Sequence, residues 1–280
     1  MPSPDSASIA QPIAFIGGGN MATAILGGLL RQGLPAAQVE VVEPFEPARE
    51  RLAREWGVQA QASAGDALRR AGLVVWAVKP QTFQDAARTV APFVTAALHL
   101  SVAAGIRSDS IARWTGTQRI VRCMPNTPAL VGRGMTALCA RGAAVTSDDR
   151  ALVERVLAPT GATLWVDAEA QLDAVTALSG SGPAYVFYFV EAMARAGVEM
   201  GLPQDKALQL AIGTFDGASE LARSAGEPPQ VLRERVTSKG GTTYAALTAM
   251  QEAGVAEAFI RAMHAAQRRA VELGDEFGAA

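Results

Sequence analysis

Short apolar runs separated by helical patterns make up the first 165 residues of the chain. The runs are rich in β-branched residues, and they lie at 12–17, 38–43, 73–78, 98–104, 119–124, 134–140 and 162–166. After the first run, segment 20–33 has a helical pattern that stops at Gly33, and a charged helix is expected up to about Trp56. Strand-like runs that alternate with helical patterns predict βαβ units and a mainly parallel, doubly wound sheet.

The pattern changes near Asp167, after which only helical patterns follow. Helices are predicted at 182–201, 202–226, 228–236, 242–254 and 255–274. Within 202–226, one helix face carries Leu208, Ala211, Phe215, Ala218 and Ala222. These helices are apolar on more than one face, so either they bury one another thoroughly or a partner subunit covers the rest. We therefore expect an α/β domain at 10–167 and an all-α domain at 168–280, and the second option suggests an oligomer.

A glycine-rich turn, IGGGNMA, follows the first strand and opens the first helix. Gly17, Gly19 and Ala22 have G-x-G-x-x-A spacing. The first position permits a tight turn, the second lets the backbone approach a pyrophosphate, and the third lets the helix pack closely on the strand. The helix N-terminus then offers free amides to phosphates. In a βαβ context this spacing favours a dinucleotide-binding turn over a purely structural one.

Glu43 ends the second predicted strand. An acidic side chain there can accept hydrogen bonds from the adenosine ribose, and it favours NAD(H) because a 2′-phosphate would meet like charge. Glu43 can also be an exposed residue beside Pro44, and Arg49 and Arg51 lie near enough in sequence to bind a phosphate instead. The sequence leaves the choice of coenzyme open.

Three further strand ends carry residues that suit a ligand, because ligands of open parallel sheets bind beyond the carboxyl ends of the strands. Lys79, in AVKPQ, can reach a coenzyme or a substrate carboxylate, or simply be solvated. The small residues of SVAAGI, at 101–106, let a flat nicotinamide ring lie against the backbone. The two prolines of MPNTPALVG can aim the Asn126 amide into the cleft, or can only frame a turn.

Composition excludes several other classes of protein. The 280 residues are 49% hydrophobic and 19% charged, which is typical of globular domains, and the net charge of −2 without a basic cluster disfavours nucleic acid as a partner. No apolar run is long enough to span a membrane. The N-terminal MPSPDSAS is expected to be a short disordered tail, and a cytoplasmic location is expected. Cys123 and Cys139 are expected to be reduced core thiols, and His99 and His264 to be structural.

Taken together, these segments resemble the pyrroline-5-carboxylate reductase family. The resemblance rests on FIGGGNMATAILGGL, AVKPQ, SVAAGI, RCMPNTPALVGRGMTAL, LSGSGPAYVFYFVEAMA and SKGGTTYAAL, which occur in the family's order from about Ile13 to the last helix. It implies a Rossmann-type domain followed by an all-α dimerisation domain, and reduction of 1-pyrroline-5-carboxylate, a cyclic imine carboxylate, to L-proline by NADPH or NADH. It also implies an active site shared between subunits and a homodimer-based assembly that extends up to a decamer.

The resemblance also implies which residues act. Thr243 is expected to be the catalytic residue, with a hydrogen bond to the pyrroline nitrogen and with Thr242 as the alternative. The substrate-binding residues are expected to be Ser238, Lys239, Gly240, Gly241 and Thr242. The coenzyme is expected to contact Ile16, Gly17, Gly18, Gly19, Asn20, Met21, Ala22, Glu43, Ala77, Val78, Lys79, Pro80, Ala103, Ala104, Gly105 and Asn126. No metal ligand is expected.

The late loop differs from the family at one position. The family usually has Ser-Pro-Gly-Gly, whereas this chain has Ser238-Lys239-Gly240-Gly241, which loosens the backbone restraint and adds a positive charge. A loop of hydroxyls, amides and one lysine suits this chemistry, because a protonated imine is already a strong electrophile and needs orientation more than a strong acid.

Two other functions are compatible with the same architecture. A β-hydroxyacid dehydrogenase needs a general base, and in that family a lysine follows a Gly-x-Gly on the long interdomain helix; the matching stretch SGSGPAYVFYFVEAMARAG has no lysine. A non-catalytic NAD(P)-sensing module would not need the polar late loop. Ser179 and Ser181 of LSGSGPAY could touch substrate, or could only permit close helix packing.

Overall fold

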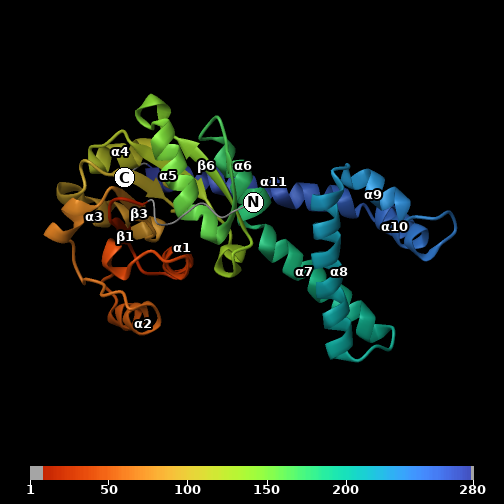
Figure 1. Cartoon of the computed structure of the whole chain (residues 1–280). Helices are drawn as coiled ribbons and strands as arrows, with labels where there is room; N and C mark the ends of the chain where they lie inside the picture. The colour runs from red at the N-terminus through yellow and green to blue at the C-terminus, as the bar shows by residue number, and fades with distance from the viewer. Residues whose placement is uncertain (1–8, 279–280) are drawn as a thin grey trace. The chain divides into compact units, whose positions relative to one another are not determined.

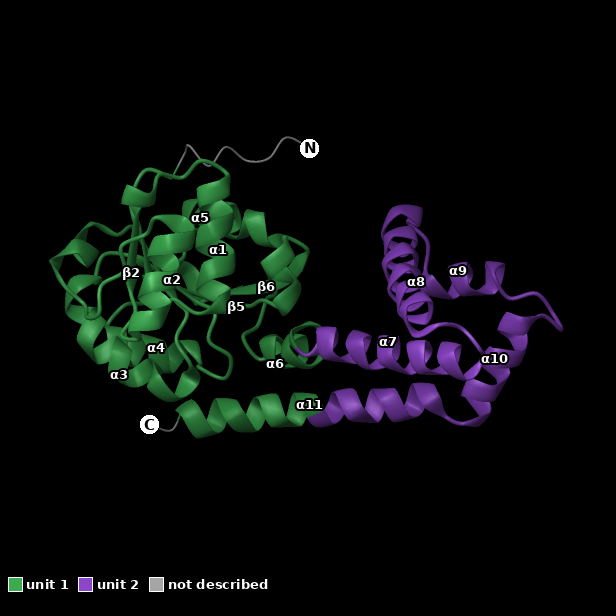
Figure 2. Ribbon diagram, turned by 90° about the horizontal axis from the view of Figure 1, so that it is seen from below, with its two compact units in different colours: residues 1–180, 266–280 green, residues 181–265 purple. Residues whose placement is uncertain are grey.

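The computed structural model describes residues 9–278; the predicted N-terminal tail at 1–8 lies outside the described residues, as do 279–280. The chain divides into two compact units, Met1–Gly180 with Ala266–Ala280, and Ser181–Ala265 (Figure 2). Within the described residues, no helix is both long enough and apolar enough to cross a membrane.

The first unit is built on a seven-stranded sheet with the order β2-β1-β3-β4-β5-β6-β7. Strands β1, β3 and β6 of this sheet are labelled in Figure 1. The strands are β1 Ile13–Ile16, β2 Val39–Val42, β3 Leu73–Trp76, β4 Leu98–Ser101, β5 Ile120–Met124, β6 Gly134–Ala140 and β7 Gly161–Trp165. Neighbouring strands are parallel except β5 and β6, which are antiparallel. All seven runs predicted as strands are strands, and the mainly parallel sheet is confirmed.

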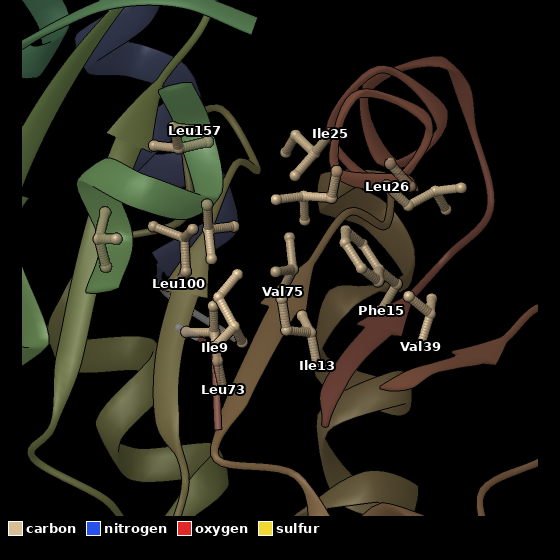
Figure 3. Packing of buried hydrophobic residues seen from close by; sticks show 14 of the residues in the cluster. Ile9, Ile13, Phe15, Ile25, Leu26, Val39, Leu73, Val75, Leu100 and Leu157 are labelled. Atoms are coloured by element: carbon tan, nitrogen blue, oxygen red, sulfur yellow. The ribbon is translucent and has the colours of Figure 1, made fainter. Parts of the chain in front are cut away.

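Both faces of the sheet are covered by helices. Successive residues of a strand point to opposite faces, so each strand contributes to two cores. Ile13 and Phe15 join a core with apolar residues of α1 and α5, and part of this core is shown in Figure 3. Ala14 and Ile16 join a second core with residues of α3 and α4 on the other face. The helices of this unit are α1 Asn20–Arg31, α2 Glu46–Trp56, α3 Pro80–Val90, α4 Ser108–Thr115, α5 Ser147–Leu157 and α6 Gln171–Val175. The sheet is therefore doubly wound, as predicted.

Short helical turns connect these elements. The 3₁₀ turns are η2 Ala36–Gln38, η3 Asp66–Arg70, η4 Ala91–Phe93, η5 Thr127–Val131, η6 Gly142–Ala144 and η7 Ala158–Thr160, and a π-helical segment, η8, spans Thr176–Gly180.

Every regular element of the second unit, all of which is described, is helical. The helices are α7 Gly182–Glu199, α8 Gln204–Ala225, α9 Pro229–Arg235, α10 Thr242–Glu252 and the first part of α11 Val255–Gly278. Tyr185 and Phe189 meet the ring of Phe259 edge-on, at 5.6 and 5.7 Å between centroids. Many large apolar side chains of α7 and α8 are nonetheless exposed, among them Phe187, Tyr188, Leu208, Leu210, Ile212 and Leu221. Within the single chain these helices therefore do not bury one another thoroughly.

The boundary between the compact units differs from the predicted change at 167/168. It falls at 180/181, and the end of α11 returns to the first unit. The residues after Asp167 stay with the sheet because Glu169 accepts hydrogen bonds from the Ser108 amide and hydroxyl, at 2.6 and 2.7 Å, and pairs with Arg122 at 2.8 Å. Phe277 packs on the second core of the sheet. The helical pattern marks a change of element type, whereas packing partners set the unit boundary.

Candidate active site

Gly17 makes the turn that leaves β1. Its φ is +98°, and a Cβ there would lie 2.6 Å from the carbonyl oxygen of Ala77 at the end of β3. Its amide donates to the Val42 carbonyl of β2, at 2.8 Å. Only glycine fits this turn, because the left-handed backbone and the close carbonyl both exclude a side chain. The ends of three strands meet at this point.

The N-terminus of α1 follows directly. The helical ladder begins with the Thr23 amide donating to the Gly19 carbonyl, at 2.9 Å, so the amides of Asn20, Met21 and Ala22 have no acceptor inside the helix. A Cβ on Gly19 would meet nothing within 4 Å, which leaves the approach to these amides open. Ala22 is fully buried, as close packing of helix and strand requires. The geometry fits a phosphate group at this helix end.

A cavity of about 640 Å³ opens beside this turn, beyond the carboxyl ends of β1, β2 and β3. In the order β2-β1-β3, the chain reverses its direction of travel across the sheet at β1, and such switch points are where open α/β sheets bind ligands. The cavity is lined by Ile16, Gly17, Gly19, Val42, Glu43, Pro44, Phe45, Ala62, Ser63, Ala64, Ala77, Val78, Lys79, Thr82, Asp85, Ala86, Thr89 and Val90.

The cavity brings together seven of the residues expected to contact the coenzyme: Ile16, Gly17, Gly19, Glu43, Ala77, Val78 and Lys79. The other expected contacts do not line it: Gly18, Asn20, Met21, Ala22, Pro80, Ala103, Ala104, Gly105 and Asn126. Sequence reasoning missed Thr82 and Asp85 on α3, although their place in the helix that follows a strand end was a usable signal. It also missed 62–64, whose position depends on an isolated bridge between Val42 and Gln61.

Glu43 lies in the cavity and braces the glycine turn. One carboxylate oxygen accepts from the Gly18 amide at 2.7 Å and the other from the Phe45 amide at 2.8 Å. The two nearby arginines bind main-chain carbonyls: Arg51 donates to Gly18 at 3.1 Å, and Arg49 donates to Glu43 itself at 3.0 Å. The cavity therefore presents a fixed negative charge at the end of β2.

Two predicted coenzyme contacts have partners within the protein. The Asn126 amide nitrogen donates to the carbonyl and the hydroxyl of Ser179, at 3.2 and 3.3 Å, and its oxygen accepts from the Met135 amide at 3.0 Å. Gly105 turns with φ +74°, and a Cβ there would lie 3.2 Å from the ring of Phe277. Asn126 thus joins the start of η5 to η8, and a contact of either residue with the coenzyme stays a prediction.

In the second unit, the loop SKGGTTY forms a tight turn into α10. Gly240 has φ +76°, and the Gly241 amide donates to the Ser238 carbonyl at 3.0 Å. A Cβ on Gly241 would lie 2.7 Å from the Ser238 hydroxyl, so this position has little room, whereas the positive φ of Gly240 favours glycine in the turn. The ladder of α10 begins with the Ala245 amide donating to Gly241 at 3.1 Å, which leaves the amides of 242–244 without an acceptor inside the helix. These amides can bind a carboxylate.

A cavity of about 900 Å³ lies next to this loop within the second unit. Its lining includes Thr237, Lys239 and Tyr244 of the loop region, together with Phe189, Arg233, Glu234, Leu247, Thr248, Met250, Gln251, Val255, Ala256, Glu257 and Phe259. Thr242, which is exposed, and Thr243, which is half-buried, do not line it. The loop therefore presents Lys239 to the cavity, whereas the two threonines lie outside its lining.

The buried histidine and the cysteines are structural, as predicted. His99 accepts a hydrogen bond from the Trp76 indole at Nδ1, at 3.1 Å, and its Nε2 lies 3.2 Å from the Val94 carbonyl. Burial lowers the pKa of His99 to about 4, so the ring is neutral near pH 7. Burial also raises the pKa of the Cys123 thiol to about 12, and both cysteines are free thiols. Neither His99 nor Cys123 can serve as an acid or base for chemistry at the cavity. His264 is exposed on α11.

Residues 169–273 match the family model described as pyrroline-5-carboxylate reductase dimerisation, and residues 12–105 match the one described as NADP oxidoreductase coenzyme F420-dependent. The chain is 42% identical over 268 residues to a pyrroline-5-carboxylate reductase of Pseudomonas aeruginosa, with 95% of this chain and 98% of that protein covered.

Solved structures of pyrroline-5-carboxylate reductases are similar to this chain over most of its length. A pyrroline-5-carboxylate reductase of Coxiella burnetii is 35% identical, with a TM-score of 0.87 over 94% of this chain and 98% of that one. A pyrroline carboxylate reductase of Plasmodium falciparum with NADP bound is 26% identical, with a TM-score of 0.84 over 95% of this chain and 98% of that one.

Proposed function

The chain belongs to the pyrroline-5-carboxylate reductase family, and we propose that it reduces 1-pyrroline-5-carboxylate to L-proline with NAD(P)H. The first unit binds the coenzyme at the glycine turn and the cavity beside it. The second unit binds the substrate at the loop Ser238–Thr243. The observation that carries this assignment is the pairing, in one chain of this family, of an open helix N-terminus after Gly19 with a second one after Gly241.

The loop of the second unit suits the substrate. The free amides at the start of α10 and the Lys239 ammonium offer donors and positive charge to the carboxylate. The Thr243 hydroxyl hydrogen-bonds the pyrroline nitrogen and orients the ring. The coenzyme, when bound, supplies a hydride to C5, and the electron pair of the C=N bond moves onto the already protonated nitrogen. No strong acid is needed, which agrees with a loop that has neither histidine nor carboxylate.

The charge of Glu43 bears on coenzyme preference. The Plasmodium falciparum relative was solved with NADP bound, and NADPH and NADH are both candidates here. In this chain a carboxylate fixed by two amides occupies the end of β2, where it can accept from a ribose hydroxyl and repels a 2′-phosphate. We propose that this chain prefers NADH.

The chain assembles as a homo-oligomer through its dimerisation domain. We propose that the exposed apolar residues of α7 and α8, such as Leu210 and Ile212, become buried against a second copy. A monomer rarely leaves so much apolar helix surface uncovered. Assembly as far as a decamer and a cytoplasmic location stay predictions.

Initial rates test the proposed function. The purified chain should oxidise NADH or NADPH only when pyrroline-5-carboxylate is present, and should form one L-proline for each coenzyme oxidised. With 3-hydroxy acids and NAD(P)⁺ it should show no turnover, because α7 carries no lysine to act as the base. Absence of turnover with both coenzymes would contradict the proposal, and oxidation of a 3-hydroxy acid would favour the dehydrogenase alternative.

A further inference from the structure

The last turns of α11 pack against the loop that follows β4. The ring of Phe277 lies 3.2 Å from the position of a Gly105 Cβ, and the Cβ of Leu273 lies 3.5 Å from it. The Arg107 guanidinium pairs with Asp275 at 2.6 Å. The buried Gly274 allows this approach, since a Cβ on it would lie 3.1 Å from the Arg107 side chain. One side of the loop is thus covered by this helix end.

Further contacts fix the helix end to the first unit. The Gly278 carbonyl accepts from the Ser110 hydroxyl at 3.4 Å and from the Arg113 guanidinium at 3.3 Å, both on α4. Phe277 packs on the core that contains Ala103 and Ile106. The end of α11, residues 273–278, is therefore anchored both at the core and at α4.

The loop Ala103–Gly105 has few side-chain contacts of its own. Ala103, Ala104 and Gly105 carry no side chain beyond a methyl group, and glycine has the greatest backbone freedom of any residue. Only Ala103 of the three is buried. Ala103 is held in the core, but Ala104 and Gly105 contribute little side-chain packing, so this part of the loop opens at low cost unless neighbouring elements restrain it. The restraint on the Gly105 side comes from Leu273 and Phe277.

The loop lies at the edge of the sheet where the coenzyme cavity opens. β4 pairs with β3 in parallel, so the residues after Ser101 emerge beside Ala77 and Val78, which line the cavity. We infer that Phe277 and Asp275 are positioning residues that hold Ala103–Gly105 in place for the nicotinamide end of the coenzyme. This inference rests on the proposed function, because it takes the loop to be part of the coenzyme site.

Helix α11 runs from the second unit into the first. The helix starts at Val255, three residues after the loop-bearing helix α10 ends at Glu252, and continues unbroken to Gly278. Phe277 lies on the part of this helix that belongs to the first unit, whereas the substrate loop belongs to the second. Loss of Phe277 should therefore disturb the placement of the hydride donor and leave the substrate loop intact.

Steady-state kinetics of the full-length enzyme test the inference. Phe277→Ala should raise the KM for coenzyme and lower kcat, with a combined loss of about ten- to a hundred-fold in kcat/KM for coenzyme, because small displacements of a reacting group are that costly. The KM for pyrroline-5-carboxylate should not change. Phe277→Leu, which keeps an apolar side chain against Gly105, should recover most of the loss. Asp275→Asn should cause a loss of about two- to five-fold, as expected for a partly exposed ion pair.

Matched controls lie on the same helix. Val271→Ala removes an exposed apolar side chain, and Glu272→Gln removes a charge that pairs only with Arg269 of α11 among the described residues. Both should have wild-type kinetics. If Phe277→Ala does not fold, then Asp275→Asn, which removes an exposed carboxylate, decides by the same criterion of coenzyme KM and kcat, and wild-type values for both would overturn the inference.

The result that would overturn the inference is a folded Phe277→Ala enzyme with wild-type kcat and coenzyme KM, or one whose only change is lower thermal stability. The coenzyme dissociation constant, followed by NAD(P)H fluorescence without substrate, separates this result from a failure of the proposed function. A wild-type chain that binds coenzyme and does not reduce pyrroline-5-carboxylate refutes the function. A weaker coenzyme constant in Phe277→Ala would still support the positioning role.

Discussion

Glu43 combines two tasks at one residue. Its carboxylate braces the glycine turn through the Gly18 amide and adds a negative charge to the coenzyme cavity. Serine at this position removes the charge that repels a 2′-phosphate and the acceptor for a ribose hydroxyl. Glu43→Ser should therefore shift the ratio of kcat/KM values toward NADPH by about ten- to a hundred-fold, which corresponds to about 1.5–3 kcal/mol.

The control for this change is Glu40→Gln on β2, the strand that Glu43 follows. Glu40 pairs with Arg70, and neither residue lines the cavity, so the NADH/NADPH ratio should stay as in the wild type. An unchanged ratio in Glu43→Ser as well would mean that the carboxylate acts only on the turn and has no part in coenzyme choice.

The buried His99 predicts how the free energy of unfolding depends on pH. Burial holds its pKa at about 4 in the folded chain, against 6.5 in an unfolded one, so between these values only the unfolded chain binds the proton. The contribution of the neutral His99 to the free energy of unfolding is therefore fully present above about pH 6.5. It is lost as the pH falls toward about 4, and the loss is about 3 kcal/mol at most. The free energy of unfolding in urea, measured from pH 7.5 to 4.5, should fall with this contribution.

His99→Gln gives the comparison. Glutamine can accept from the Trp76 indole and donate to the Val94 carbonyl without titrating. Its unfolding free energy should fall less steeply with pH than that of the wild type. Parallel curves for the two proteins would show that the ring is not held neutral by burial.

At the scale of elements, the strands were predictable because of where they lie. β1 and β3 are buried on both faces, so each reads as an unbroken apolar run, IAFI and LVVW respectively. The helices of the second unit were predictable from periodicity and from punctuation by glycine and proline, as at Pro183 and Gly226. The glycine turn was predictable because each small residue of its spacing has a physical role in a turn between a strand and a helix.

Other features depend on contacts between residues distant in the sequence, and no local pattern signals them. The partner of Asn126 is Ser179, 53 residues away, and the partner of Gly105 is Phe277. The π-helical segment Thr176–Gly180 has no distinctive composition. The return of α11 to the first compact unit likewise has no local signal in the sequence. In the candidate site, the turns were predictable and the packing behind them was not.

The late loop shows how an element tolerates a change. The turn is set by the positive φ of Gly240 and by the close approach of Gly241 to Ser238, and Lys239 is exposed between them. Proline, which the family usually has at this position, would restrict the backbone further, yet the two glycines are enough to form the turn. Lysine adds a charge that lines the neighbouring cavity, where it can attract an anionic substrate.

At the scale of the whole molecule, we propose that the first unit binds the coenzyme and the second binds the substrate. The coenzyme cavity is lined only by residues of the first unit, and the substrate loop and its cavity only by residues of the second. A change in the loop should therefore affect the use of pyrroline-5-carboxylate and leave coenzyme binding alone. This separation distinguishes a substrate-binding loop from a connector between two helices.

Thr243→Ala tests this claim most directly. It should lower kcat/KM for pyrroline-5-carboxylate by about ten- to a hundred-fold, because one hydrogen bond to a charged group is worth about 1.5–3 kcal/mol, whereas loss of a general acid would cost up to about 10⁴-fold. The NADPH dissociation constant should stay at the wild-type value, and Thr243→Ser should retain most activity because the hydroxyl remains. Wild-type kcat/KM in Thr243→Ala would contradict the account and leave the loop as a connector.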